Sequence, residues 1–254
     1  MINIVLRAVA INSKGEVMKQ NIKLTKRTEI ANSTMAFHFE KPEGLEFRAG
    51  QFCDLTLLEP PETDDEGNIR GFSLVNAPFE DEVVVATRMR DTAFKRVLKD
   101  MPIGTEVEFD GPYGDFTLHK NESTPAVFLI GGIGVTPVLS MIAQATHDKT
   151  EHKILLLHSS RTPEDLPFVA EFEKLASENP NFTYVPAASD GSSDSFKGEH
   201  GRIGKLMLEK YVEDLSAPKY YLSGPAVMVK AMRELLTELD ADEDNIRTEE
   251  FSGY

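Results

Sequence analysis

Short stretches of alternating apolar and polar residues dominate the chain from Asn21 to about Leu118. Alternation with a period of two is typical of strands that bury one face. Turn sequences such as 41–44 and 102–104 separate these stretches, and one helical period covers about 92–99. The predicted strands cover residues 22–25, 35–39, 52–58, 72–75, 83–87 and 107–109. Short strands at regular spacing predict a small antiparallel β-barrel.

After about residue 122 the pattern changes, and apolar strands alternate with helical periods. A strand precedes a helix three times, at 126–130 and 137–145, at 154–158 and 167–176, and at 220–223 and 226–239. Nearly continuous apolar strands between helices are typical of a parallel sheet covered on both faces. The predicted fold therefore has two domains, an all-β antiparallel barrel over residues 19–122 and an α/β parallel-sheet domain over residues 123–254.

Residues 1–18 continue neither pattern, with an apolar start followed by Asn12-Ser13-Lys14-Gly15. We expect this segment to be an N-terminal extension that is not native, with Met18 as the natural start. The opening apolar run is too short, and too soon broken by charge, to be a signal peptide. No apolar run approaches the roughly 20 residues needed to span a bilayer. A cytoplasmic location is therefore expected.

Composition narrows the possible classes of function. The chain has 254 residues, of which 41% are apolar and 27% charged, as in a globular protein. Its net charge of −15 argues against binding to nucleic acid, which needs a basic surface. The single cysteine, Cys53, rules out an internal disulfide and an iron–sulfur cluster held by this sequence. The six histidines form no metal-binding spacing, so no metal is expected.

One basic segment interrupts the acidic chain between Arg88 and Lys99. It can be a solvated helix face, or it can hold flavin phosphates or dock a partner. A run of charges does not decide between these interpretations.

Two short segments carry the candidate chemistry. Arg70-Gly71-Phe72-Ser73 combines a planar cation that suits a pyrophosphate, an aromatic ring and a hydroxyl. Alone, this tetrapeptide favours an ordinary strand leaving a loop. The second segment, Gly131 to Pro137, follows an apolar strand and opens a helix, which makes it a candidate anion site or a purely structural turn. In this order, the two segments predict a flavin site followed by a pyridine-dinucleotide site.

Four ordered motifs closely resemble the ferredoxin–NADP reductase-like flavoprotein oxidoreductase family. They are Arg-x-Phe-Ser at 70–73, Gly-Pro-Tyr-Gly-Asp-Phe at 111–116, Gly-Gly-Ile-Gly-Val-Thr-Pro at 131–137 and Leu-Ser-Gly-Pro at 222–225. The resemblance covers about residues 20–254. It implies an FAD-binding barrel and an NAD(P)-binding α/β domain whose ligands meet at the cleft, where open α/β sheets bind ligands.

Carried over by position, the resemblance implies the residues of the flavin site. Arg70 would bind the flavin phosphates, Phe72 would stack on the isoalloxazine ring and Ser73 would hydrogen-bond flavin N5. The family more often has tyrosine where this chain has Phe72, so a hydroxyl contact to the ribityl chain is lost and stacking survives. Thr92 and Ala93 would open the helix that faces the pyrophosphate. Further residues expected at the cofactor are Gly71, Thr87, Arg88 and Phe116, the last stacking on adenine and thereby favouring FAD over FMN.

The same resemblance implies the nucleotide site. Its nicotinamide end would be shaped by Gly132, Gly134, Thr136, Pro137, Gly224 and Pro225. Ser223 stands where the family has a cysteine near the reacting carbon. Hydride transfer is therefore expected to be slower than in relatives that have the thiol. Ser160 and Arg161 follow a strand, and an arginine there can pair with the 2′-phosphate of NADPH. Arg161 can instead cover the adenosine or pair with Glu164 or Asp165, so NADPH is only slightly favoured over NADH.

The chain ends in Glu-Glu-Phe-Ser-Gly-Tyr. By the resemblance, Tyr254 would cover the flavin face that nicotinamide must reach, and Glu250 would be the acidic residue near the flavin. A frayed terminus is the alternative.

These features together predict an FAD-dependent NAD(P)H oxidoreductase that passes hydride between NAD(P)H and flavin N5, and single electrons to a ferredoxin- or flavodoxin-type carrier protein. Ser73, Ser223, Glu250 and Tyr254 are the expected catalytic residues. The alternatives are the reductase component of a multi-component oxygenase and a flavin-binding redox sensor with slow turnover.

Overall fold

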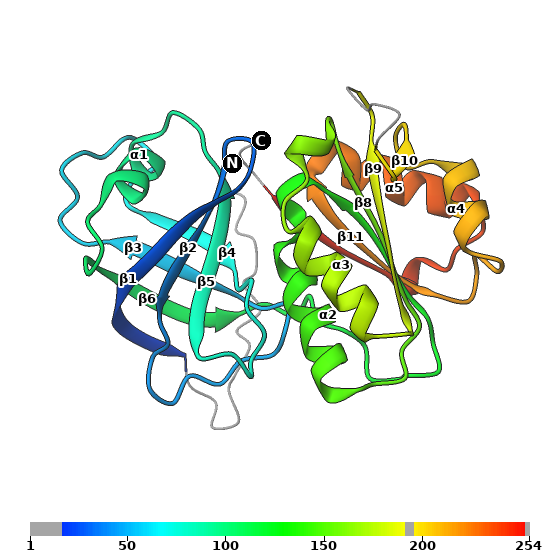
Figure 1. Ribbon diagram of the computed structural model, residues 1–254, viewed down its shortest axis with the longest axis horizontal. Coiled ribbons are helices and arrows are strands. Elements are labelled where there is room, and N and C mark those ends of the chain that lie inside the picture. Colours follow the sequence, from blue (N-terminus) through cyan, green and yellow to red (C-terminus); the bar gives the residue numbers. More distant parts are fainter. Residues whose placement is uncertain (1–16, 191–195, 252–254) are drawn as a thin grey trace.

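A computed structural model describes residues 17–190 and 196–251, and Figure 1 shows two lobes side by side. The first lobe is built from six strands and one helix. They are β1 (Met18–Ala31), β2 (Thr34–Glu40), β3 (Phe52–Leu57), β4 (Ile69–Ser73), β5 (Glu82–Arg88), α1 (Ala93–Asp100) and β6 (Glu106–Tyr113). Every strand pair in this sheet is antiparallel, in the order β4-β3-β6-β1-β2-β5.

The first sheet curls so that its two edge strands approach each other. The Val75 N–H, just after β4, donates to the Val84 carbonyl of β5 at 2.8 Å. The interior is filled by apolar side chains from alternate strand positions, including Phe37, Phe39 and Phe109, each fully buried. The alternation in the sequence therefore corresponds to one face turned into a barrel core.

The second lobe is a parallel sheet with helices. Its elements are β7 (Ala126–Gly131), η1 (Gly132–Val135), α2 (Thr136–Asp148), β8 (Ile154–Ser160), η2 (Pro163–Asp165), α3 (Val169–Glu178), β9 (Phe182–Ala188), β10 (Glu199–His200), α4 (Lys205–Tyr211), β11 (Lys219–Pro225), α5 (Ala226–Glu238), η3 (Glu243–Asn245) and β12 (Ile246–Phe251). The strand order is β10-β9-β8-β7-β11-β12, and all pairs are parallel. The predicted fold class is thus confirmed.

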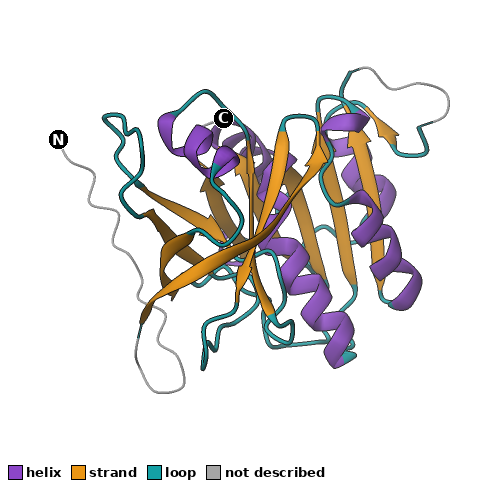
Figure 2. Ribbon diagram, turned by 60° about the vertical axis from the view of Figure 1, so that its left-hand side comes forward, coloured by secondary structure: helices purple, strands orange, loops and turns teal. Residues whose placement is uncertain are grey.

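Helices cover both faces of this sheet, as Figure 2 shows. Helices α2 and α3 pack on the face whose core also takes in residues of the barrel, among them Ala36, Val84 and Phe116. Helices α4 and α5 pack on the opposite face. The strands are apolar on both sides for this reason.

The two lobes share a continuous core, and hydrogen bonds cross between them. Ser140 of α2 donates to the Asn76 carbonyl at 2.7 Å, and Arg247 of β12 donates to the Thr117 carbonyl at 2.6 Å. These contacts hold the carboxyl ends of β7, β8 and β11 next to the ends of β4 and β5. The boundary predicted near residue 122 lies in the connection between β6 and β7.

The predicted extension over residues 1–18 lies almost entirely outside the described residues, and β1 begins at Met18. Within the described ranges, no helix combines the length and the apolar character needed to cross a membrane.

Candidate functional site

A cavity of about 230 Å³, the barrel cavity, lies where β4 and β5 end beside α1 and η1. Seven predicted cofactor residues line it: Arg70, Gly71, Phe72, Ser73, Thr87, Arg88 and Thr92. They come from three separate segments of the chain, and the fold brings them to one place.

Positive charge concentrates around the barrel cavity. Arg70, Arg88, Arg90 and Lys95 all line it. Burial lowers the pKa of Lys95, and the neighbouring charges of Arg90 and Arg70 lower it further, which shows how closely the cations gather. Within residues 17–190 and 196–251, neither Arg88 nor Arg90 forms an ion pair. Such a cluster fits an anionic group, and the diphosphate of FAD is one.

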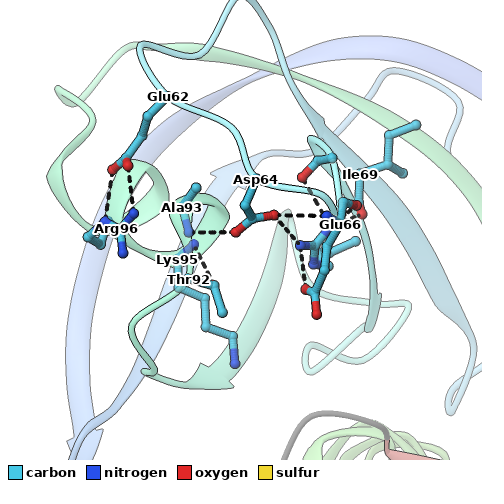
Figure 3. A network of polar contacts seen from close by, with 10 residues as sticks. Glu62, Asp64, Glu66, Ile69, Thr92, Ala93, Lys95 and Arg96 are labelled. Atoms are coloured by element: carbon cyan, nitrogen blue, oxygen red, sulfur yellow. Dashed lines mark hydrogen bonds and ion pairs between the residues drawn. The ribbon is translucent and has the colours of Figure 1, made fainter.

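Carboxylates of the β3–β4 loop already contact part of this cluster, as Figure 3 shows. Arg70 Nη2 lies 2.7 Å from Glu66 Oε2 and 3.7 Å from Asp64 Oδ1. Arg70 Nη1 donates to the carbonyls of Glu66, Gly67 and Ile69 at 2.8–3.2 Å. Arg70 therefore anchors the loop as well as facing the cavity.

The first turn of α1 is capped in the same network. The Thr92 side chain accepts from Lys95 N–H at 3.4 Å, and Asp64 Oδ2 accepts from Ala93 N–H at 2.9 Å. The N–H of Ala93 is one of the helix donors that a phosphate could use. Ala93 itself is buried and does not line the cavity.

Two residues at the end of β4 line the barrel cavity with an aromatic ring and a hydroxyl group. Phe72 is 7% exposed, and its ring centroid lies 5.9 Å from that of Phe94 in the barrel core. Ser73 is 4% exposed. Because strand side chains alternate, both can line one cavity only at a strand end, which is where they lie.

The second cavity, the sheet cavity, measures about 900 Å³ and lies at the carboxyl ends of the parallel strands. It is lined by Gly132 after β7 and by Pro225 after β11. The sheet order runs outward from β7 in one direction through β8 and in the other through β11. Ligands of open α/β sheets bind at such a reversal of strand order.

Some predicted nucleotide residues lie behind the sheet cavity and do not line it. A Cβ on Gly134 would come within 2.7 Å of the backbone of Ser223 and Gly224. Thr136 is buried and donates its hydroxyl to the Ile133 carbonyl at 3.1 Å, and Pro137 lies in the first turn of α2. These residues shape the η1 turn from inside. The roles predicted for them stay predictions.

Ser223 is fully buried beside this turn, and its Oγ has no hydrogen-bond partner among the residues that the structure describes. A buried hydroxyl usually has a partner. Ser223 ends the apolar part of β11 and pairs in register with Glu249.

The adenosine end predicted for the nucleotide falls in the sheet cavity. Ser160 and Arg161 line it, together with Arg202 and Asp190. Arg161 is largely exposed, and its Nε lies 3.6 Å from Asp190 Oδ2, a different carboxylate from Glu164 and Asp165, the partners named as an alternative to a nucleotide phosphate. Two arginines at this end fit an anionic nucleotide.

The two cavities meet. Arg88 and Ile133 line both of them, so the barrel cavity and the sheet cavity adjoin at the η1 turn. Groups bound in the two cavities would therefore lie next to each other.

The C-terminal strand β12 contributes residues that the sequence analysis did not choose. Phe251 lines the barrel cavity, and Arg247, four residues earlier on the same face, contacts the barrel. The carboxyl of Glu249, between them on that face, is largely buried, whereas Glu250 is exposed on the opposite face. Tyr254 lies outside the described residues, so its predicted role as a lid has no structural description.

Phe116 occupies a different place from the one expected of an adenine platform. Its ring is 6% exposed and meets Tyr221 edge-on at 5.7 Å, inside the core between the lobes. Stacking on adenine would require the ring to leave this contact. Sequence reasoning missed some residues that line the barrel cavity or left them as a general basic segment: Glu66, Ala86, Arg90, Lys95, Ile133 and Phe251.

Glu249 is expected to make stability depend on pH. Burial, with a smaller contribution from the nearby charge of Asp115, raises the pKa of Glu249 to about 8. Between about pH 4.5 and pH 8 the folded state therefore holds a proton that the unfolded state has released, so stability falls as pH rises through this window. Glu249→Gln should remove this slope and be more stable than the parent at pH 8, with little difference near pH 4.5. Denaturant unfolding at several pH values measures how the free energy of unfolding changes with pH. Glu250→Gln is the control, because Glu250 is exposed and its substitution should leave this slope unchanged.

Comparison with known proteins agrees with this geometry. The Oxidoreductase FAD-binding domain family matches residues 21–118, and the Oxidoreductase NAD-binding domain family matches residues 128–234. One component of the Na(+)-translocating NADH-quinone reductase of Pseudoalteromonas atlantica is 30% identical over 74% of this chain and 50% of its own length. The reductase component of phenol 2-monooxygenase of a Pseudomonas species is 29% identical over 88% of this chain and 63% of its own length. The chain thus spans about half to three fifths of these relatives.

Among solved structures, the cytochrome P450 reductase GcoB of Amycolatopsis superposes with a TM-score of 0.80 and 26% identity, over 92% of this chain and 70% of that one. The structure thus combines a barrel and a parallel sheet whose cavities adjoin. The FAD-binding family matches the barrel, and the NAD-binding family matches the parallel-sheet domain. The chain belongs to the ferredoxin–NADP reductase-like family of flavoprotein oxidoreductases, with FAD and a nicotinamide dinucleotide as its cofactors.

Proposed function

We propose that the chain is the flavin- and nucleotide-binding part of an NAD(P)H-dependent electron-transfer enzyme. When both cofactors are bound, they supply hydride transfer between nicotinamide and flavin N5, and single electrons for a carrier protein. The observation that carries the proposal is that the barrel cavity and the sheet cavity adjoin through Arg88 and Ile133. Hydride transfer needs two rings in contact, and adjoining cavities provide for that.

The residues of the chain have positioning roles in this proposal. Arg88, Arg90 and Lys95 would bind the flavin diphosphate from one side of the barrel cavity, and Ser73 would hydrogen-bond the ring. Phe251 would cover the ring from β12, the place that the sequence analysis gave to Tyr254. Arg161 and Arg202 would bind the phosphates at the adenosine end of the nucleotide, with NADPH favoured over NADH.

The partner in this proposal is a small electron carrier, of ferredoxin or flavodoxin type or an iron–sulfur protein of an oxygenase. The similarity to a phenol 2-monooxygenase reductase component favours the oxygenase system as the second candidate. The one cysteine of this sequence, Cys53, is fully buried, so a cluster would have to be held by other thiolates. A cytoplasmic location belongs to the same proposal.

An anaerobic titration tests the proposal. The FAD-loaded protein is mixed with NADPH and, separately, with NADH, and the visible absorption of the flavin is followed. Rapid bleaching by one nucleotide is expected, with NADPH the faster. A flavin that neither nucleotide bleaches would contradict a reductase and favour a slow sensor.

A further inference from the structure

One buried histidine holds the turn at which the two cavities meet. His158, near the end of β8, is fully buried, and its Nε2 lies 3.0 Å from the carbonyl oxygen of Gly132. Its Nδ1 lies 3.4 Å from the hydroxyl of Tyr184 on the neighbouring strand β9. His158 itself lines neither cavity, whereas Gly132 lines the sheet cavity.

The chemistry of the two partners assigns the proton. Burial lowers the pKa of His158 to about 4, so the ring is neutral near pH 7 and carries one N–H. A carbonyl oxygen can only accept, so the hydrogen belongs on Nε2, which donates to Gly132. Nδ1 is then the acceptor, and the Tyr184 hydroxyl donates to it.

This hydrogen bond sets the orientation of one peptide unit. Gly132 has a φ of +50° and begins η1, so its backbone is in a region that few other residues adopt. The C=O of Gly132 and the N–H of Ile133 belong to the same planar trans peptide and point in opposite directions. With the carbonyl turned toward His158, the Ile133 N–H points away from His158, and Ile133 lines both cavities. The first N–H groups of a helix have no partner within it, so this donor is available to a ligand.

We propose that His158 is a positioning residue that holds the Gly132–Ile133 peptide with its N–H facing the bound nicotinamide dinucleotide. The proposal rests on the proposed function, because it assumes that the sheet cavity binds NAD(P)H. His158 acts through the backbone and touches no reacting atom.

Variants of His158 separate a hydrogen-bonding role from simple filling of space. His158→Gln keeps an N–H that can reach the Gly132 carbonyl, and His158→Met fills similar volume without a donor. Calorimetric titration of the FAD-loaded proteins with NADP⁺ and with NAD⁺ gives a Kd without electron transfer. His158→Met should weaken binding about 10-fold, the effect of losing one well-placed hydrogen bond, and His158→Gln should stay within about 3-fold of the parent.

The controls distinguish an effect on the orientation of the Gly132–Ile133 peptide from an effect on the stability of the protein. Tyr184→Phe removes the partner of Nδ1 but leaves the Nε2–H, so its Kd should remain close to that of the parent. Flavin content and the thermal midpoint are measured for each protein, since a merely structural role would change these and not the Kd. Should His158→Met fail to fold, His158→Asn takes its place, because the shorter amide cannot reach the carbonyl.

Equal Kd values for the parent and the donor-free variant would overturn the proposal, and so would equal weakening by His158→Gln and His158→Met. A parent protein that binds neither nucleotide would overturn the proposed function together with the proposal. Nucleotide binding by the parent that His158→Met leaves unchanged would remove only the role of His158.

Discussion

Gly134→Ala is expected to destabilise the protein on the order of 3 kcal/mol and to weaken nucleotide binding. A Cβ at this position would come within 2.7 Å of the Gly224 nitrogen and the Ser223 carbonyl carbon. Both are backbone atoms, so no side chain can turn away to make room. The η1 turn would have to move away from the end of β11, and these two segments border the sheet cavity through Gly132 and Pro225.

Gly204→Ala is the matched control for this substitution. Gly204 has an extended backbone with a φ of −157°, and its Cβ would have only the Arg202 carbonyl oxygen nearby, at 3.9 Å. Its stability should change by less than about 1 kcal/mol. Denaturant unfolding of both variants measures the difference in the free energy of unfolding. Titration with NADP⁺ measures the change in nucleotide affinity. Equal stability of the two variants would show that the turn and β11 can separate without cost.

The glycine motif illustrates which part of a site a sequence can predict. The run from Gly131 to Pro137 indicated a tight turn after a strand, and the structure has one. The sequence does not say which glycine faces a ligand and which faces another strand end. Gly132 lines the sheet cavity, whereas Gly134 contacts β11, a strand that is far away in the sequence.

The fold class was predictable because the two halves of the chain differ in period. The strands that sequence reasoning missed are β9, β10 and β12, the outer members of the second sheet. In β9, Pro186 argues against a strand, yet it lies beside His158 of β8, while among the described residues β10 pairs only with Ala187 and Ala188. Strand β12, Ile246–Phe251, pairs among the described residues on one side only, with β11, and its sequence is too polar to be recognised as a strand by hydrophobicity.

The alternation of β12 separates two neighbouring carboxylates. Glu249 and Glu250 are adjacent, and only the alternation of a strand decides which of them turns toward the barrel. The resemblance gives Glu250 the place near the flavin, and that role stays a prediction; the structure buries the carboxyl of Glu249 and exposes Glu250. The motif at Arg70 shows the same limit, because no sequence pattern indicates that Asp64 and Glu66 fold back onto the arginine.

These two carboxylates lead to the second large effect. Asp64→Asn combined with Glu66→Gln is expected to tighten FAD binding about 10-fold, or about 1.4 kcal/mol. Asp64 and Glu66 place negative charge beside Arg70 and the Ala93 N–H, groups that a diphosphate would otherwise reach. Each amide keeps an oxygen that can accept the same hydrogen bonds, so the loop can stay folded while the repulsion of the cofactor is removed. Titration of the apoprotein with FAD, followed by quenching of flavin fluorescence, gives the affinity.

Glu62→Gln is the control because Glu62 belongs to the same loop but pairs with Arg96, which does not line the barrel cavity. It removes one negative charge from the loop without removing any at the cavity, so its FAD affinity should stay near that of the parent. The gain in the double variant should also shrink as salt is added, since exposed charges are screened over about 8 Å at physiological ionic strength. An affinity in the double variant no tighter than in Glu62→Gln would mean that the loop carboxylates do not compete with the diphosphate. Arg70 would then serve the loop, and Arg88, Arg90 and Lys95 would bind the phosphates without it.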